Sequence, residues 1–310
     1  MDYLPFVRRQ LTNHLWKQYK DQVNHASIID KVLTKLTGED LILDHFAIID
    51  LPSQTTGLNS LCEIFSSIGY IVQGQGYLAE KKNEFVWLRE ADAQEKPVGN
   101  VLPQVVVADF WVDEMPTNIR RIIEKSTKEI KHEFLPEIQN LSRKSYLGDQ
   151  KSAHELVELL IKYFERDRPL PTIKDFKEVR EYNELLSWVL VFGRHPNHFG
   201  LSVHFLNKFE SLKAFNSFIE DEMNITLNKI GGYIKGTKEQ GLEQSSTNGE
   251  EILLQLADGP IHIPDRFVEF VWRHPKNEYK NPQKWHHYFT GFITQNAEGI
   301  VESVYRDKNP

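Results

Sequence analysis

The sequence predicts an α+β fold in which two βαβββ modules form one cupped mixed sheet around a shared site. A strand, a helix and further strands follow one another twice, in residues 41–112 and in residues 197–273. The opening strand of each unit carries a His beside a Phe, and the segment between the units has a charged, helical pattern. Two open sheets placed side by side enclose a cavity, where side chains at matching positions converge.

Composition is that of a soluble globular protein. Hydrophobic residues make up 40% and charged residues 26% of the 310-residue chain. The net charge of −7 gives no positive excess that would attract nucleic acid or anionic lipid. No apolar run approaches the ~20 residues of a membrane span, and the N-terminus shows no secretory signal. We therefore expect a cytoplasmic single domain, 1–310, without nucleic-acid or membrane partners; the sequence indicates no oligomeric state.

Residues 1–40 are expected to form N-terminal helices, because apolar residues recur at helical spacing and Gly38 follows as a stop. The apolar, β-branched run 41–49 predicts a buried strand that opens the first module, 41–112. The rest of this module is expected as one helix and three strands, near 57–67, 69–78, 84–89 and 104–112.

Residues 113–196 carry an amphipathic, charged pattern and are expected as an insertion of three or four helices. The second module, 197–273, opens with the strand 197–205. It continues with a helix and four strands, near 209–221, 230–235, 241–245, 252–257 and 266–273. A C-terminal extension, 274–310, is expected to hold one more strand at 288–294 and a short helix.

Three short matches support a duplication. The segments DHFAI (44–48) and NHFGL (197–201) share a polar residue, His, Phe, a small residue and an aliphatic residue, 153 positions apart (198 − 45). The other two matches are 76–77 with 232–233 and 109–110 with 269–270, at offsets of 156 and 160. The offset grows slowly, as small loop insertions between repeated elements would cause.

The two repeated histidines predict a common site. Alternation along a strand places His45 on one face with Ala47, and His198 on one face with Gly200 and Ser202. Small side chains beside both histidines leave room for a ligand. A third polar residue, Glu269, stands in the apolar strand RFVEFVWR, where an unpaired buried carboxylate is very costly.

A divalent metal ion bound by His45, His198 and Glu269 supplies the cation that this carboxylate needs. Two His and one carboxylate form the facial set of non-haem Fe(II) oxygenases, and the same set also binds Zn²⁺, Mn²⁺ or Ni²⁺. The structural alternative stays open. A His on an apolar strand is more often a hydrogen-bonded core residue than a ligand, and Glu269 could pair with Arg266 or Arg273 instead.

The strings DHFAI, PNHFGLSVHF and RFVEFVWR, in this order, resemble the 2-oxoadipate dioxygenase/decarboxylase (hydroxyglutarate synthase) family. That family is related to the vicinal oxygen chelate superfamily of paired βαβββ modules. The resemblance covers roughly residues 5–275 and implies that His45, His198 and Glu269 hold one Fe(II) ion per chain. It also implies oxidative decarboxylation of a 2-oxo dicarboxylic acid such as 2-oxoadipate, in which O₂ is consumed and CO₂ and a 2-hydroxy acid are released.

One departure from the family concerns the substrate. In the family, an Arg a few residues after the first His binds the substrate carboxylate, but here residues 47–50 read AIID. Arg273 is the candidate replacement, and Ser202 and His204, on the inferred face of His198, are further candidates for substrate binding. Asp109, which the repeat matches to Glu269, is a candidate extra ligand or hydrogen-bond acceptor beside the metal.

Two other functions stay open on the same residues. A metal-dependent isomerase, lyase or hydrolase would consume no O₂ and would turn over with a redox-inert metal. A non-catalytic small-molecule-binding protein would bind its ligand tightly without turnover under any metal.

Overall fold

The computed structural model describes residues 1–128, 130 and 133–304, so the last six residues of the expected C-terminal extension lie outside the described part. Its helices and strands, in chain order, are α1 (Leu4–Gln22), α2 (Asn24–Thr37), β1 (Leu43–Ile49), α3 (Leu58–Ser67), β2 (Tyr70–Leu78), β3 (Asn83–Glu90), β4 (Gln104–Phe110), α4 (Thr117–Lys128), α5 (Leu135–Tyr146), α6 (Gln150–Phe164), α7 (Ile173–Tyr182), α8 (Glu184–Phe192), β5 (His198–Ser202), α9 (Leu212–Met223), β6 (Lys235–Thr237), β7 (Leu242–Ser246), β8 (Glu251–Leu256), β9 (Gly259–Pro264), β10 (Phe267–Arg273) and α10 (Thr294–Val301).

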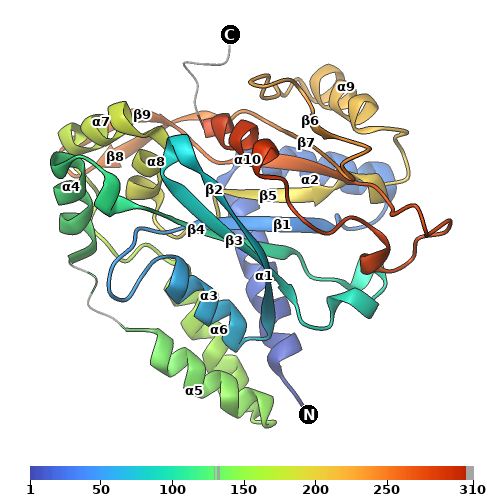
Figure 1. Cartoon of the computed structure of the whole chain (residues 1–310), viewed down its shortest axis with the longest axis horizontal. Coiled ribbons are helices and arrows are strands. Elements are labelled where there is room, and N and C mark those ends of the chain that lie inside the picture. The colour runs from blue at the N-terminus through green and yellow to red at the C-terminus, as the bar shows by residue number, and fades with distance from the viewer. Residues whose placement is uncertain (129, 131–132, 305–310) are drawn as a thin grey trace.

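Eight strands form one mixed sheet in the order β2-β3-β4-β1-β5-β10-β7-β6. The opening strands of the two modules, β1 and β5, are antiparallel neighbours at its centre, with Ala47 opposite His198. On its other side each pairs in parallel with the last strand of its own module, β1 with β4 and β5 with β10. Read outward from the centre, both halves have the same strand order, which confirms the predicted α+β fold of paired modules in one curled sheet (Figure 1).

Both faces of the sheet are buried at its central strands, in two separate apolar clusters. Phe46, Ile48 and Phe270 point to the outer face, where α1, α2, α3 and α9 cover the strands. The residues that alternate with them, such as Ile49 and Phe267, point to the inner face and pack with α8 and α10. The alternation of strand side chains therefore separates a helix-covered face from a concave face that carries both histidines.

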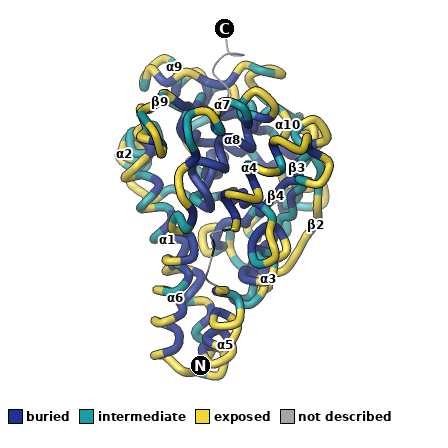
Figure 2. Tube along the Cα trace, turned by 90° about the vertical axis from the view of Figure 1, so that its left-hand side faces the viewer, coloured by how far each residue is buried: buried dark blue, intermediate teal, exposed yellow. Residues whose placement is uncertain are grey.

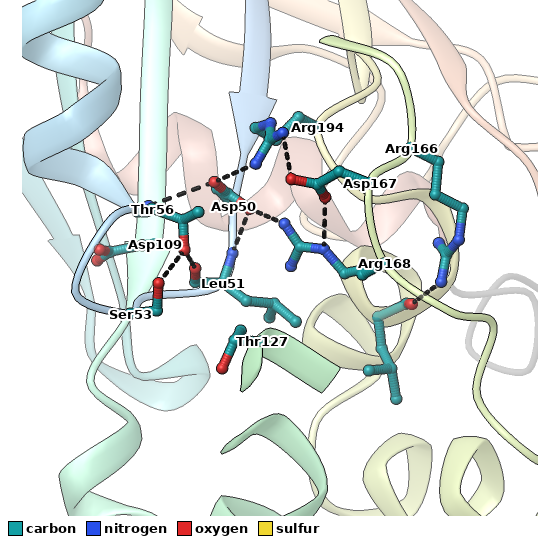
Figure 3. A network of polar contacts seen from close by, with 12 residues as sticks. Asp50, Leu51, Ser53, Thr56, Asp109, Thr127, Arg166, Asp167, Arg168 and Arg194 are labelled. Atoms are coloured by element: carbon teal, nitrogen blue, oxygen red, sulfur yellow. Dashed lines mark hydrogen bonds and ion pairs between the residues drawn. The ribbon is translucent and has the colours of Figure 1, made fainter. Parts of the chain in front are cut away.

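The insertion between β4 and β5 holds five helices in its described part, α4 to α8, rather than three or four. Helices α5 and α6 pack with the start of α1 and form the narrow end of the molecule (Figure 2). Helix α8 is mostly apolar and is buried from residue 185 to residue 192. Arg168, before α7, and Arg194, just after α8, form ion pairs with Asp50, which directly follows β1 (Figure 3).

The C-terminal part of the chain differs from expectation in two ways. The strand near 252–257 exists as β8, but it pairs with β9 in a separate two-stranded sheet. The strand expected at 288–294 is wrong, because this segment crosses the concave side and leads into α10 instead. Helix α10 contacts β2, β6 and β7, so it bridges the two edges of the curled sheet. No helix in the described part is long and apolar enough to cross a membrane.

Candidate metal centre

His45 and His198 meet on the inner face, at the centre of the sheet. Their rings lie edge to face with 5.3 Å between the centroids. Gly200 lies opposite His45 in the antiparallel pair, and a Cβ atom there would be 2.5 Å from Cε1 of His45. The small residue that follows the second HF string therefore provides the space in which the ring of the first His lies.

Glu269 completes the group from β10. Its Oε2 atom lies 3.3 Å from Nε2 of His45 and 3.4 Å from Nε2 of His198. One ligand atom from each residue lies within 4.8 Å of the others, and all three residues are buried. The second carboxylate oxygen, Oε1, accepts a hydrogen bond of 2.6 Å from Nε2 of Gln244 on β7. The carboxylate is thus oriented with one oxygen toward both imidazoles.

The residue before each histidine orients its ring. Nδ1 of His45 lies 2.9 Å from Oδ1 of Asp44, and Nδ1 of His198 lies 3.0 Å from Oδ1 of Asn197. Because both oxygens accept, each Nδ1 carries a proton, so in the neutral form of each imidazole the Nε2 lone pair is available to a metal. The repeated sequence pattern is therefore also a repeated hydrogen-bond pattern.

A cavity of about 60 Å³ opens beside the three residues. Its walls are apolar, with Ile49, Leu78, Phe85, Ala108 and Ile300 among the lining residues. Phe292 covers the ring of His45 edge to face at 4.9 Å between centroids. The cluster thus lies at the base of a small apolar chamber that the segment leading into α10 and α10 itself close.

Comparison with known proteins agrees with the fold and the cluster. The family model for 2-oxoadipate dioxygenase/decarboxylase matches residues 9–291. The chain belongs to this family. It is 28% identical over 288 residues to the chloroplastic 2-oxoadipate dioxygenase/decarboxylase of Arabidopsis thaliana, covering 90% of this chain and 72% of that protein. The resemblance predicted from three short strings is confirmed.

Two solved structures are similar in fold. The hydroxyglutarate synthase of Oryza sativa, in complex with 2-oxoadipate, has a TM-score of 0.78 at 26% identity and covers 98% of this chain and 93% of that one. A putative glyoxalase superfamily protein from Ralstonia eutropha has a TM-score of 0.73 at 17% identity, covering 92% and 85%. The second likeness concerns the fold alone.

The charges of the cluster in this family member are balanced by one proton. Burial disfavours a charge on His45, but the Glu269 and Asp44 carboxylates outweigh it and raise its pKa to about 9. Burial lowers the pKa of His198 to about 3. Burial also opposes ionisation of Glu269, yet the neighbouring His45 holds its pKa below the ordinary value. A divalent cation would take the place of the His45 proton, since metal-binding imidazoles are neutral.

Arg273 lies behind this cluster and not in the cavity. Its Nε and Nη2 atoms donate to the two oxygens of Asp44 at 2.7 and 2.9 Å, and Nη1 donates to the carbonyls of Phe289 and Gly291. This corrects the expectation that Arg273 meets a substrate carboxylate, because its donors are already taken inside the protein. It acts on His45 instead, through Asp44.

Two further expectations are corrected in the same region. Ser202 donates to Oδ2 of Asp44 at 3.2 Å, so it supports the same carboxylate. His204 lies in the turn after β5, with Nδ1 3.2 Å from the carbonyl of Val271. Neither side chain lines the cavity. Ser202 is the last residue of β5, so His204 lies beyond the strand and no longer shares a strand face with His198.

Asp109 lies on the opposite face of the sheet from the metal cluster. Its neighbour Ala108 lines the cavity, so alternation turns Asp109 outward, where Oδ2 accepts from the backbone N–H of Leu58 at 2.8 Å. Strand register explains the error. Glu269 lies opposite Gly200, and the matching position opposite Ala47 is Val106, not Asp109. The expected role of Asp109 beside the metal is therefore corrected to a contact with the start of α3.

Asp44, Asn197 and Gln244 are site residues that the sequence-based prediction missed. Asp44 carried a detectable signal, because it is the polar residue before His in the first repeat and matches Asn197 in the second. Gln244 carried none, since its role depends on the pairing of β7 with β10, which local sequence does not reveal.

Proposed function

We propose that this chain is a metal-dependent dioxygenase that oxidatively decarboxylates a 2-oxo acid, with one Fe(II) held by His45, His198 and Glu269. The observation that carries the proposal is the buried group of two imidazoles and one carboxylate on adjacent central strands. Membership of the 2-oxoadipate dioxygenase/decarboxylase family supports the reaction class. The Oryza relative binds 2-oxoadipate, a 2-oxo dicarboxylic acid, which makes this compound the reference substrate.

The residues fit a metal of this kind. Both Nδ1 atoms are engaged by neighbouring side chains, so two Nε2 atoms and one carboxylate oxygen converge, and a metal would bind them once His45 releases its extra proton. This donor set suits Fe(II) and also accepts Zn²⁺, Mn²⁺ or Ni²⁺. When bound, Fe(II) supplies a Lewis-acidic and redox-active centre with open positions for a 2-oxo acid and O₂.

The protein's own part is orientation and exclusion of water. Asp44 and Asn197 fix the rotation of the two imidazoles, and Gln244 fixes the carboxylate of Glu269. The apolar walls and the cover provided by Phe292 keep bulk water from the reacting carbon atoms. The overall reaction balances as one 2-oxo acid and one O₂ giving CO₂ and a 2-hydroxy acid shorter by one carbon.

The test is O₂ uptake by protein loaded anaerobically with Fe(II) and then given 2-oxo acids, with 2-oxoadipate first. We expect equal amounts of O₂ consumed and CO₂ released. His45→Ala, His198→Ala and Glu269→Ala should each remain folded, lose the metal by elemental analysis and consume no O₂.

Other outcomes distinguish the alternatives. Turnover with Zn²⁺ and without O₂ would assign a redox-neutral isomerase, lyase or hydrolase to the same cluster. Tight binding of a 2-oxo acid without turnover under any of these metals would assign a non-catalytic binding protein. Full metal content in all three alanine variants would refute the ligand assignment itself.

A further inference from the structure

Away from the metal cluster, the cavity wall carries no positive charge. In residues 1–128, 130 and 133–304, no Lys or Arg side chain lines it. Away from the cluster, the lining is almost entirely apolar and comes from both the sheet and α10, with Ile49, Leu78, Phe85 and Ile300 among the lining residues. Asn83 is a polar exception, and its amide nitrogen already donates to the carbonyl of Asp109 at 2.7 Å.

Two buried cations of the second module have partners elsewhere. The guanidinium of Arg273 is held by Asp44 and by two backbone carbonyls. The ammonium of Lys235 donates to the carbonyl of Asn228 at 2.9 Å, and its side chain packs under Gly299 of α10. Neither side chain lines the cavity, and both cations are held by oxygen atoms of the protein.

This distribution of charge determines which substrate tail is favourable. A carboxylate moved from water into an apolar chamber without a cation loses its hydration and gains nothing in return. An alkyl group of the same length gains from the removal of its apolar surface from water. This cost does not apply to the 2-oxo acid head of the substrate, because its carboxylate meets the positive charge of the metal.

We infer that the cavity selects 2-oxo acids with an uncharged aliphatic tail over 2-oxo dicarboxylic acids. This inference rests on the proposed function, since it places the 2-oxo acid head at the metal cluster. The tail points toward Ile49, which shares the inner strand face with His45 on β1, and toward Ile300 of α10; both residues line the cavity. Ile49 and Ile300 are thus the residues that determine tail specificity.

A matched pair of ligands tests the inference. 2-Oxohexanoate and 2-oxoadipate have six carbons and the same 2-oxo acid head, and differ only in the terminal carboxylate. Their dissociation constants are measured by calorimetry, under anaerobic conditions, on protein loaded with Mn²⁺. We expect 2-oxohexanoate to bind at least about tenfold more tightly.

A variant adds an independent readout. Ile49→Arg places a guanidinium in the cavity and should reverse the preference toward 2-oxoadipate, whereas Ile49→Met, which changes shape without charge, should not. Metal content of both variants is measured as a check that the cluster is intact. Because the wild-type comparison stands alone, failure of one variant to fold leaves the main test in place.

The outcomes separate the two proposals. Equal binding of both ligands, or tighter binding of 2-oxoadipate by the wild type, overturns the inference on tail specificity and leaves the proposed function standing. Binding of neither 2-oxo acid by metal-loaded protein overturns the proposed function, and the inference falls with it.

Discussion

The ring of His45 occupies space that exists only because residue 200 has no side chain. An added Cβ would lie 2.5 Å from Cε1 and 2.6 Å from Nδ1 of the imidazole. The backbone of Gly200 is ordinary strand, so an alanine there is compatible with the local conformation. The conflict is with the ring alone.

We therefore predict that Gly200→Ala displaces His45 and weakens metal binding by about 10- to 100-fold, the usual range for disturbed ligand orientation. Metal affinity is measured by calorimetry, and circular dichroism verifies the fold. Gly99→Ala is the matched control, because an added Cβ at that exposed position meets nothing within 4 Å. If Gly200→Ala binds metal as tightly as the wild type, metal binding does not depend on the present position of the His45 imidazole.

Asp44 and Asn197 are equivalent residues of different charge. Both accept from Nδ1 of the following histidine, but only Asp44 is a carboxylate, held by Arg273. Its pKa lies well below the usual range, because Arg273 and His45 outweigh the effect of burial. A charged acceptor makes the imidazole a stronger ligand than a neutral one does.

Asp44→Asn should keep the hydrogen bond to His45, as Asn197 does for His198, and lose the charge. We predict a metal affinity about tenfold lower, with the stoichiometry unchanged at saturation. The exposed Asp40→Asn is the control for loss of one negative charge from the chain. If Asp44→Asn binds metal as tightly as the wild type, the charge of Asp44 has no part in ligand strength.

The residues of the site were predictable to different degrees. His45, His198 and Glu269 could be predicted because repetition and an odd carboxylate in an apolar strand are visible in the chain itself. The role of Arg273 could not. Alternation shows which face a side chain occupies, but not that Asp44, 229 positions earlier, occupies its guanidinium.

At the scale of elements, strand register decides what faces the metal. The repeat predicted the order and type of nearly every strand, yet it matched Asp109 to Glu269 when the structure matches Val106. An alignment of Glu269 with Asp109 and one with Val106, three residues earlier, look alike in sequence, because loop insertions shift the offset by similar amounts. Hydrogen-bond register between β1 and β4 distinguishes them, and that is a long-range property.

The contact between Asp109 and the start of α3 predicts how the stability of the protein changes with pH. It accepts from the N–H of Leu58 at the start of this helix, but burial raises its pKa to about 6 from 3.8, with Glu84 and Asp50 adding to the shift. The folded state thus holds a proton that the unfolded state releases near pH 4. Stability attributable to this group is therefore present below pH 4 and lost as the pH rises to about 6.

Asp109→Asn keeps an acceptor for Leu58 and cannot ionise. Relative to the wild type, its free energy of unfolding should increase by about 2 kcal/mol between pH 4 and pH 7, at ~1.4 kcal/mol per pKa unit. Urea denaturation at both pH values measures the difference. The exposed Asp113→Asn should show no such trend, and a pH-independent difference between wild type and Asp109→Asn would contradict the assignment.

At the scale of the whole molecule, two segments outside the modules complete the site. Helix α10 contacts both edges of the curled sheet and closes the concave side. The helical insertion is attached to the end of β1, where Asp50 meets Arg168 and Arg194 (Figure 3). Neither attachment was predictable, because each joins segments far apart in the sequence through ion pairs or apolar contacts without a local pattern.

The ion pairs of Asp50 are fully buried. Burial opposes ionisation of Asp50, but Arg168 and Arg194 outweigh it and lower its pKa. Asp167 lies between the same two arginines and accepts from Arg194 (Figure 3). The network connects the insertion to the strand that carries His45, one residue beyond Ile49 of the cavity wall.

Arg168→Met should therefore destabilise the whole fold rather than the metal site alone. Removal of one partner leaves Asp50 buried with weaker compensation, which costs about 3 kcal/mol in comparable pairs. Chemical denaturation measures this loss, and Arg143→Met, at an exposed position on α5, should change stability by no more than about 0.5 kcal/mol. Metal stoichiometry in folded Arg168→Met should stay at one ion per chain. A variant of wild-type stability would show that the insertion is held to β1 by its apolar contacts and that the buried charges contribute little to the attachment.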